Sequence, residues 1–169
     1  MTFDNSKTII GLRIRIFIAT VILLTYVVLA YIAEVISDPF LGMSVTIWTI
    51  ALIFVWLIMA IYPVVLNYQY VYFSDEGDII VFRYFTASIF GGRKNSVEIY
   101  KNSFAGYKTE TRFFGMMHSI VLFQKLREGV AKYPPIYISN LNAKEKARVL
   151  NSLYLYTPKD VKDVTIEHE

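Results

Sequence analysis

Side chains that could support metal binding or acid–base chemistry are scarce in this sequence. The 169 residues include no cysteine and only two histidines, so the chain has neither thiolate ligands nor disulfides. His118 lies in a β-rich block, and neither His118 nor His168 has acidic residues at the spacing of metal ligands. No nucleophile elbow, phosphate-binding loop or dinucleotide fingerprint occurs. The sequence therefore predicts a protein that is not an enzyme and that has no metal or cofactor.

The most concentrated basic stretch is 91-GGRK-94. Adjacent glycines can present backbone N–H groups to an anion, and Arg93 and Lys94 add positive charge. Three further basic residues on the following strands could extend this edge: Lys101, Lys108 and Arg112. Two interpretations stay open, namely contact with anionic lipid or an acidic partner, and a solvated turn. Nucleic acid is not expected, because the net charge is only +3 and no aromatic–glycine RNA signature occurs.

The hydrophobic composition of the chain indicates that part of it lies in a membrane. Hydrophobic residues make up 55% of the chain and charged residues 18%, a bias that favours a membrane protein. Two long runs without acidic or basic side chains are long enough to cross a bilayer as helices, and we expect spans at about 14–36 and 43–66. A cleaved signal peptide for the first run is disfavoured, because its apolar stretch is longer than the apolar core of a signal peptide. Buried core helices of a soluble protein are disfavoured for both runs, because neither run has a polar stripe.

The flanks of the two spans predict their orientation. Lys7, Arg13 and Arg15 precede the first span, whereas the connection between the spans carries Glu34 and Asp38 and no basic residue. The positive-inside rule then puts both termini in the cytoplasm. Basic and aromatic side chains that we expect at the membrane interfaces are Arg13, Arg15, Trp48, Tyr62, Tyr68 and Tyr70.

After the second span the pattern changes from a helical to a strand period. Residues 68–74 and 79–85 are rich in Tyr, Val and Phe, and the polar turn 75–78 between them contains Gly77, so we expect a hairpin. Further short blocks, with Gly106 expected at a bulge, bring the count to about seven strands. They are 86–90, 96–100, 104–111, 117–126 and 133–139.

A capped amphipathic helix is expected over 142–156, with Asn142 and Glu145 forming the cap. Its apolar face is predicted to contain Ala143, Ala147, Leu150 and Tyr154. The tail 157–169 begins with the helix-stopping Pro158 and is expected to be loose. The predicted division is therefore an N-terminal segment with two spans (1–67), a β domain (68–156) and a tail (157–169).

This arrangement resembles the bacterial membrane-anchored pleckstrin-homology-like (PH-like) proteins over about residues 10–156. The segments that carry the resemblance are 70-YVYFSDEGDIIVFRYF-85, 112-RFFGMMHSIVLFQ-124 and 136-IYISNLNAKEKARVLNSL-153. The resemblance implies an α+β membrane protein of the bacterial cytoplasmic membrane, with a PH-like antiparallel β-sandwich or barrel capped by the C-terminal helix. The chain departs from phosphoinositide-binding relatives of this fold, because its first hairpin loop, 75–78, is acidic and repels phosphate.

The resemblance implies binding and assembly rather than catalysis, and it is an analogy of fold. We therefore expect a membrane-anchored protein whose cytoplasmic β domain contacts another membrane protein or complex. The alternative is recognition of anionic membrane lipid through the basic edge.

Overall fold

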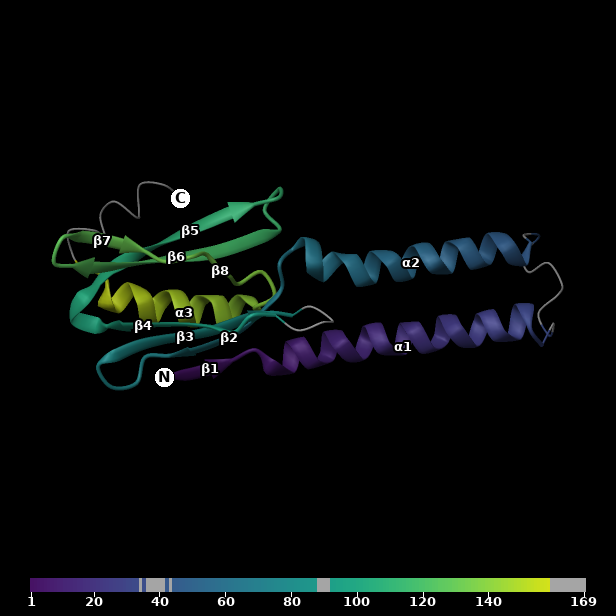
Figure 1. The fold of residues 1–169 in the computed structure, drawn as a ribbon, viewed down its shortest axis with the longest axis horizontal. Helices are drawn as coiled ribbons and strands as arrows, with labels where there is room; N and C mark the ends of the chain where they lie inside the picture. Colours follow the sequence, from purple (N-terminus) through teal and green to yellow (C-terminus); the bar gives the residue numbers. More distant parts are fainter. Residues whose placement is uncertain (34, 36–41, 43, 88–91, 159–169) are drawn as a thin grey trace. The chain divides into compact units, whose positions relative to one another are not determined.

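The computed structural model describes residues 1–33, 35, 42, 44–87 and 92–158. Its contacts divide the chain into two compact units, Ile10–Val65 and a second unit that joins Met1–Ile9 to Leu66–Glu169. We call the second one the β unit. The elements, labelled in Figure 1, are β1 (Thr2–Asp4), α1 (Ser6–Tyr31), α2 (Val45–Val65), β2 (Gln69–Ser74), β3 (Ile79–Thr86), β4 (Asn95–Tyr100), η1 (Lys101–Ser103), β5 (Phe104–Arg112), β6 (Met117–Leu126), β7 (Gly129–Lys132), β8 (Ile136–Tyr137) and α3 (Ala143–Tyr156).

Helices α1 and α2 have 26 and 21 residues and are long and apolar enough to cross a membrane. Only 6% of the apolar stretch of α1 is buried, and none of that of α2. Side chains link the two helices, since Trp56 Nε1 donates to Thr20 Oγ1 at 2.9 Å and the Tyr31 hydroxyl lies 2.9 Å from Thr49 Oγ1. Such polar contacts between helices are a common means of pairing apolar helices.

The strands of the β unit form two antiparallel sheets. The first has the order β1-β2-β3-β4, and the second has β5 beside β6, with β7 and β8 both pairing along the other side of β6. Successive strands β4 and β5 do not pair; η1 carries the chain from one sheet to the other. The two sheets therefore do not close, and the predicted barrel alternative is wrong.

A strand that the sequence analysis did not predict lies at the start of the chain. Residues Thr2–Asp4 form β1 and pair with β2, with Phe3 opposite Phe73. Three residues are too few for a periodic pattern to be recognised, and the apolar run that follows dominates any window that includes them. Among the described residues the β unit contains eight strands, and β7 is a second one that was not predicted.

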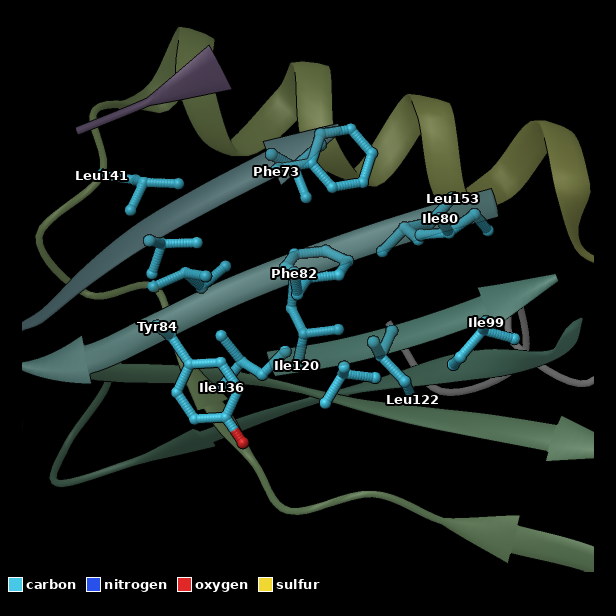
Figure 2. Packing of buried hydrophobic residues seen from close by; sticks show 14 of the residues in the cluster. Phe73, Ile80, Phe82, Tyr84, Ile99, Ile120, Leu122, Ile136, Leu141 and Leu153 are labelled. Atoms are coloured by element: carbon cyan, nitrogen blue, oxygen red, sulfur yellow. The ribbon is translucent and has the colours of Figure 1, made fainter. Parts of the chain in front are cut away.

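Apolar side chains from both sheets and from α3 form one core, which Figure 2 shows from close by. The inward-facing residues of the first sheet alternate along each strand, as Val71 and Phe73 do on β2, in the way expected of a sheet with one buried face. Phe73 and Phe82 face each other on neighbouring strands with ring centroids 4.8 Å apart. Ile120, Leu122 and Ile136 supply the face of the second sheet.

Several local predictions are confirmed. The hairpin β2–β3 turns at residues 75–78 with Gly77 at φ 67°, and the register of β5 against β6 shifts between Phe104 and Gly106. Asn142 and Glu145 form a reciprocal capping box, with Glu145 N donating to Asn142 Oδ1 at 2.8 Å and Asn142 N to Glu145 Oε2 at 2.9 Å.

Two other local predictions are wrong. The expected strand 133–139 is reduced to Ile136–Tyr137, because Pro134 and Pro135 donate no backbone hydrogen bond and separate β7 from β8. The buried face of α3 is centred on Val149 and Leu153. Of the residues predicted for that face, Ala143, Ala147 and Tyr154 are exposed and Leu150 is partly buried. Three predicted features lie outside the described residues, at least in large part: the acidic connection between the spans, the block 86–90 and the tail after Pro158.

Candidate binding surfaces of the β unit

A buried group of amide side chains marks the end of the β unit at which the chain passes into α1 and returns from α2. Asn5 is 1% exposed, and its Nδ2 donates to the backbone oxygen of Gln69 at 2.9 Å. Asn140 Nδ2 donates to the same oxygen at 2.8 Å, and Gln69 Oε1 accepts from Tyr137 N at 3.0 Å. We call this end the helix-linked end. The opposite, distal end carries the turn 75–78 and η1.

The loop Gly92–Lys94 also lies at the helix-linked end. The register places Thr86, the last residue of β3, opposite Gln69. A Cβ atom on Gly92 would lie 2.7 Å from the Thr86 nitrogen and 2.8 Å from its oxygen, so this position accepts only glycine unless the backbone shifts. The close approach keeps the exposed side chains of Arg93 and Lys94 beside the end of β3.

An apolar turn between β5 and β6 lies at the same end (Figure 1). Ser119 of β6 pairs with Tyr137, whose nitrogen donates to Gln69. Met116 precedes Ser119 by three positions, about 10 Å along the strand. The side chains of Phe113, Phe114 and Met116 are 54%, 102% and 47% exposed. We call Phe113–Met116 the apolar tip.

The five basic residues singled out from the sequence do not form one cluster. Arg93, Lys94 and Arg112 lie at the helix-linked end, since Arg112 pairs with Met117 beside the apolar tip. Lys108 is exposed within β5. Lys101 lies at the distal end, separated from Lys94 by the six residues of β4, about 20 Å of strand. Its Nζ donates to the Asp75 oxygen at 2.8 Å and lies 4.3 Å from the centre of the Tyr156 ring.

The outward face of the first sheet carries aromatic side chains and one arginine. Tyr70 and Phe85 stack with centroids 4.7 Å apart, and burial, followed by the nearby Asp4 carboxylate, raises the pKa of the Tyr70 phenol. The Arg83 guanidinium lies 5.9 Å from the Tyr72 ring centroid and 3.9 Å from Glu98. This aromatic face runs from the helix-linked end towards the distal end. Sequence reasoning singled out Tyr68 and Tyr70 but missed Arg83, which the strand register places opposite Tyr72.

The predicted interfacial residues fall in both units. Arg13 and Arg15 are exposed on α1, and Trp48 and Tyr62 lie on α2. Tyr68 directly precedes β2, where its oxygen accepts from Ala87 N at 2.8 Å. Tyr70 lies inside β2 on the aromatic face. Only the first four therefore lie on the two apolar helices.

His118 and Asp75, which lie near opposite ends of α3, both have shifted pKa values. Burial, reinforced by the Lys146 ammonium, lowers the pKa of His118, whose Nδ1 lies 3.3 Å from Thr111 Oγ1. Burial opposes ionisation of Asp75, but hydrogen bonds from the N-terminal amine and Ser152 Oγ leave its pKa lowered overall. His118 and Asp75 are therefore both in contact with polar groups of the fold itself. Among the described residues, no group of three or more acidic or histidine side chains could hold a metal ion.

Comparison of the chain with protein-family models, with characterised proteins and with solved structures finds no match. The PH-like assignment therefore stays a prediction from the sequence pattern, and function has to be argued from the surfaces described above.

Proposed function

We propose that this chain is a membrane-anchored binding protein. In this proposal α1 and α2 cross the bacterial cytoplasmic membrane with both termini on the cytoplasmic side, and the β unit has a PH-like role in binding another membrane protein or complex. The observation that carries the proposal is the aromatic face with its single arginine, displayed by a domain that is joined to two exposed apolar helices.

The exposure of the helices supports membrane insertion. A core helix of a soluble protein buries most of its apolar side chains, whereas the apolar stretches of α1 and α2 are almost wholly unburied. In water these surfaces would far exceed the apolar patches that soluble monomers tolerate. A bilayer covers them, and their lengths fit its hydrocarbon core of about 30 Å.

The connections to the β unit support a role at the membrane surface. Asn5, the residue before α1, is hydrogen-bonded to β2, and only three residues separate Val65 of α2 from Gln69 of β2. Connections this short leave only a few residues of chain between the helix-linked end and the two apolar helices. A partner that the β unit binds there is most readily another membrane protein.

The aromatic face has the composition of a protein-binding surface. Tyr and Arg are enriched among the residues that contribute most to protein interfaces. Tyr72 is half-buried and Arg83 is exposed, and the ion pair of Arg83 with Glu98 is long and solvent-exposed, so it opposes rearrangement only weakly. The Arg83 side chain can therefore reorganise around a partner at small energetic cost.

The test is purification of the tagged full-length chain from native membranes in mild detergent, with mass spectrometry of co-purifying proteins. We expect a partner in fixed ratio that is lost in the double variant Tyr72→Ala/Arg83→Ala. The matched control, Arg127→Ala/Leu155→Ala, removes one arginine and one large apolar side chain, both exposed, elsewhere on the β unit. A photo-crosslinker at position 83 should label the same partner. Retention of the partner by the first variant, or no partner at all, would reject the proposal.

Anionic-lipid binding is the second candidate function, and it rests on Arg93, Lys94 and Arg112 lying at the helix-linked end. Lysine and arginine near a membrane surface each contribute about 1 kcal/mol of attraction to anionic lipid. In nanodiscs that mix zwitterionic and anionic lipid, Arg93→Glu/Lys94→Glu should reduce the anionic lipid retained by the full-length chain. The control Lys125→Glu/Arg127→Glu makes the same charge change at the β6–β7 turn. Equal retention by both variants would exclude this candidate.

A further inference from the structure

The turn between β5 and β6 combines two features that the fold does not require. Phe113 and Phe114 adopt the left-handed backbone conformation, with φ of 56° and 52°, which is unfavourable for bulky side chains. Their rings contribute little to the core, because Phe114 is fully exposed and Phe113 is 54% exposed. Glycine or asparagine would adopt the same backbone at lower cost. Residues in a strained conformation that bury so little of their side chains point to a function outside the folded domain.

The position of the tip on the β unit limits what can cover it. The apolar tip lies at the helix-linked end, close along β6 to the Tyr137–Gln69 contact, and Gln69 begins β2 just after α2. The chain leaves for α1 at the same end. The apolar tip therefore lies at the end of the β unit that the chain connects directly to α1 and α2.

The residues around the tip fit the interfacial zone of a bilayer. Phe and Met are apolar side chains suited to the boundary between headgroups and acyl chains, and a basic residue beside them suits phosphate headgroups. Arg112 provides that charge, since its side chain is 65% exposed, and its guanidinium forms an ion pair with Glu110 at 3.0 Å. Arg93 and Lys94 add positive charge at the same end.

We propose that the apolar tip, Phe113–Met116, inserts into the lipid interface and gives the β unit a third attachment to the membrane besides α1 and α2. The ligand is the bilayer itself rather than a protein. A contact between the tip and lipid would restrict the orientations that the β unit can take at the membrane, and with them the direction in which the aromatic face is presented. This inference rests on the proposed membrane anchoring and adds to it a lipid-contact site on the β unit.

The absence of native cysteine permits a direct test with the full-length chain. Phe114→Cys, labelled with an environment-sensitive fluorophore, is reconstituted at one copy per nanodisc of phosphatidylcholine. We expect blue-shifted emission and loss of fluorescence when the lipid carries doxyl groups near the headgroup. Arg127→Cys at the β6–β7 turn should instead be quenched by aqueous iodide and unaffected by doxyl lipid. Met116→Cys repeats the measurement without replacing either phenylalanine.

A label in the middle of α2, at Phe54→Cys, separates failure of this inference from failure of the anchoring. If doxyl lipid quenches position 54 but iodide alone quenches positions 114 and 116, the helices cross the membrane and the tip does not insert, so the inference is wrong. If position 54 also escapes lipid quenching, the anchoring itself is wrong. A blue shift at position 114 without lipid quenching would mean that protein covers the tip, which also overturns the inference.

Discussion

Asn5 and Gln69 are hydrogen-bonded to each other although 64 positions separate them in the chain. Asn5 Nδ2 donates to the Gln69 backbone oxygen at 2.9 Å, and Asn5 Oδ1 accepts from Val71 N at 2.8 Å. Both apolar helices lie between these two residues in sequence. The β unit is therefore assembled from segments before and after the helices, and each of its crossings into the helical unit is fixed to the sheet by buried hydrogen bonds.

A first prediction follows for a chain without the helices. If residues 10–65 are replaced by a short Gly/Ser linker, Met1–Ile9 can still pair with β2, and we expect a soluble, folded β unit. A chain that starts at Leu66 lacks β1 and Asn5 and leaves backbone groups of β2 unpaired. Its free energy of unfolding should be lower by about 2–4 kcal/mol, the loss of a few hydrogen bonds. Urea denaturation followed by circular dichroism measures the difference, and equal stability would show that β1 is dispensable.

A second prediction isolates Asn5 itself. Asn5→Ala leaves the buried Val71 N–H without its side-chain acceptor, and it removes one of the two donors to the Gln69 oxygen. An unsatisfied buried group costs about 1–3 kcal/mol, so the free energy of unfolding should fall by that amount. Asn102→Ala is the matched control, because Asn102 is exposed in η1. Similar losses for both variants would contradict the role assigned to Asn5.

The parts of the fold that could be predicted are those with a local cause. The β2–β3 turn follows from Gly77, the start of α3 from Asn142 and Glu145, and the two apolar helices from uninterrupted hydrophobic runs. β1 could not be predicted, because its three residues owe their conformation to pairing with β2, more than 60 positions away. The buried face of α3 also depends on which side chains the two sheets leave room for.

The candidate surfaces were predictable only in part, for the same reason. Arg93 and Lys94 were identified from their charge. Which other basic residues lie near them depends on strand register, which places Arg112 at the same helix-linked end of the β unit and Lys101 at the distal end. The apolar tip was included in the segment that carries the family resemblance, yet nothing in its sequence shows that Phe113 and Phe114 are exposed. Their exposure and their backbone conformation follow from the turn between β5 and β6.

A third prediction separates the stability of the tip from its function. Phe114→Gly removes a side chain that buries nothing and relieves the left-handed strain, so the free energy of unfolding should rise by up to about 1 kcal/mol. At the next position the opposite kind of change, Gly115→Ala, places a Cβ on a residue with φ of 86° and should lower the free energy of unfolding by a similar amount. Thermal unfolding of the full-length chain in detergent measures both. A loss of stability in Phe114→Gly would mean that the ring supports the fold.

The last prediction concerns His118 and pH. Burial and the Lys146 ammonium lower the pKa of His118 in the folded chain below its usual value of 6.5. Between these two pKa values the unfolded chain binds a proton that the folded chain does not, so the free energy of unfolding increases with pH in this window. The contribution is complete above pH 6.5 and is lost as the pH falls towards the folded pKa.

Unfolding of the full-length chain in detergent at a series of pH values across this window tests the effect. We expect His118→Gln to flatten the profile, because glutamine does not titrate. Lys146→Met should weaken the dependence without abolishing it, since it removes the neighbouring positive charge but leaves the burial of His118 in place. A profile that keeps its full slope in His118→Gln would assign the pH dependence to another group and would leave His118 with a packing role alone.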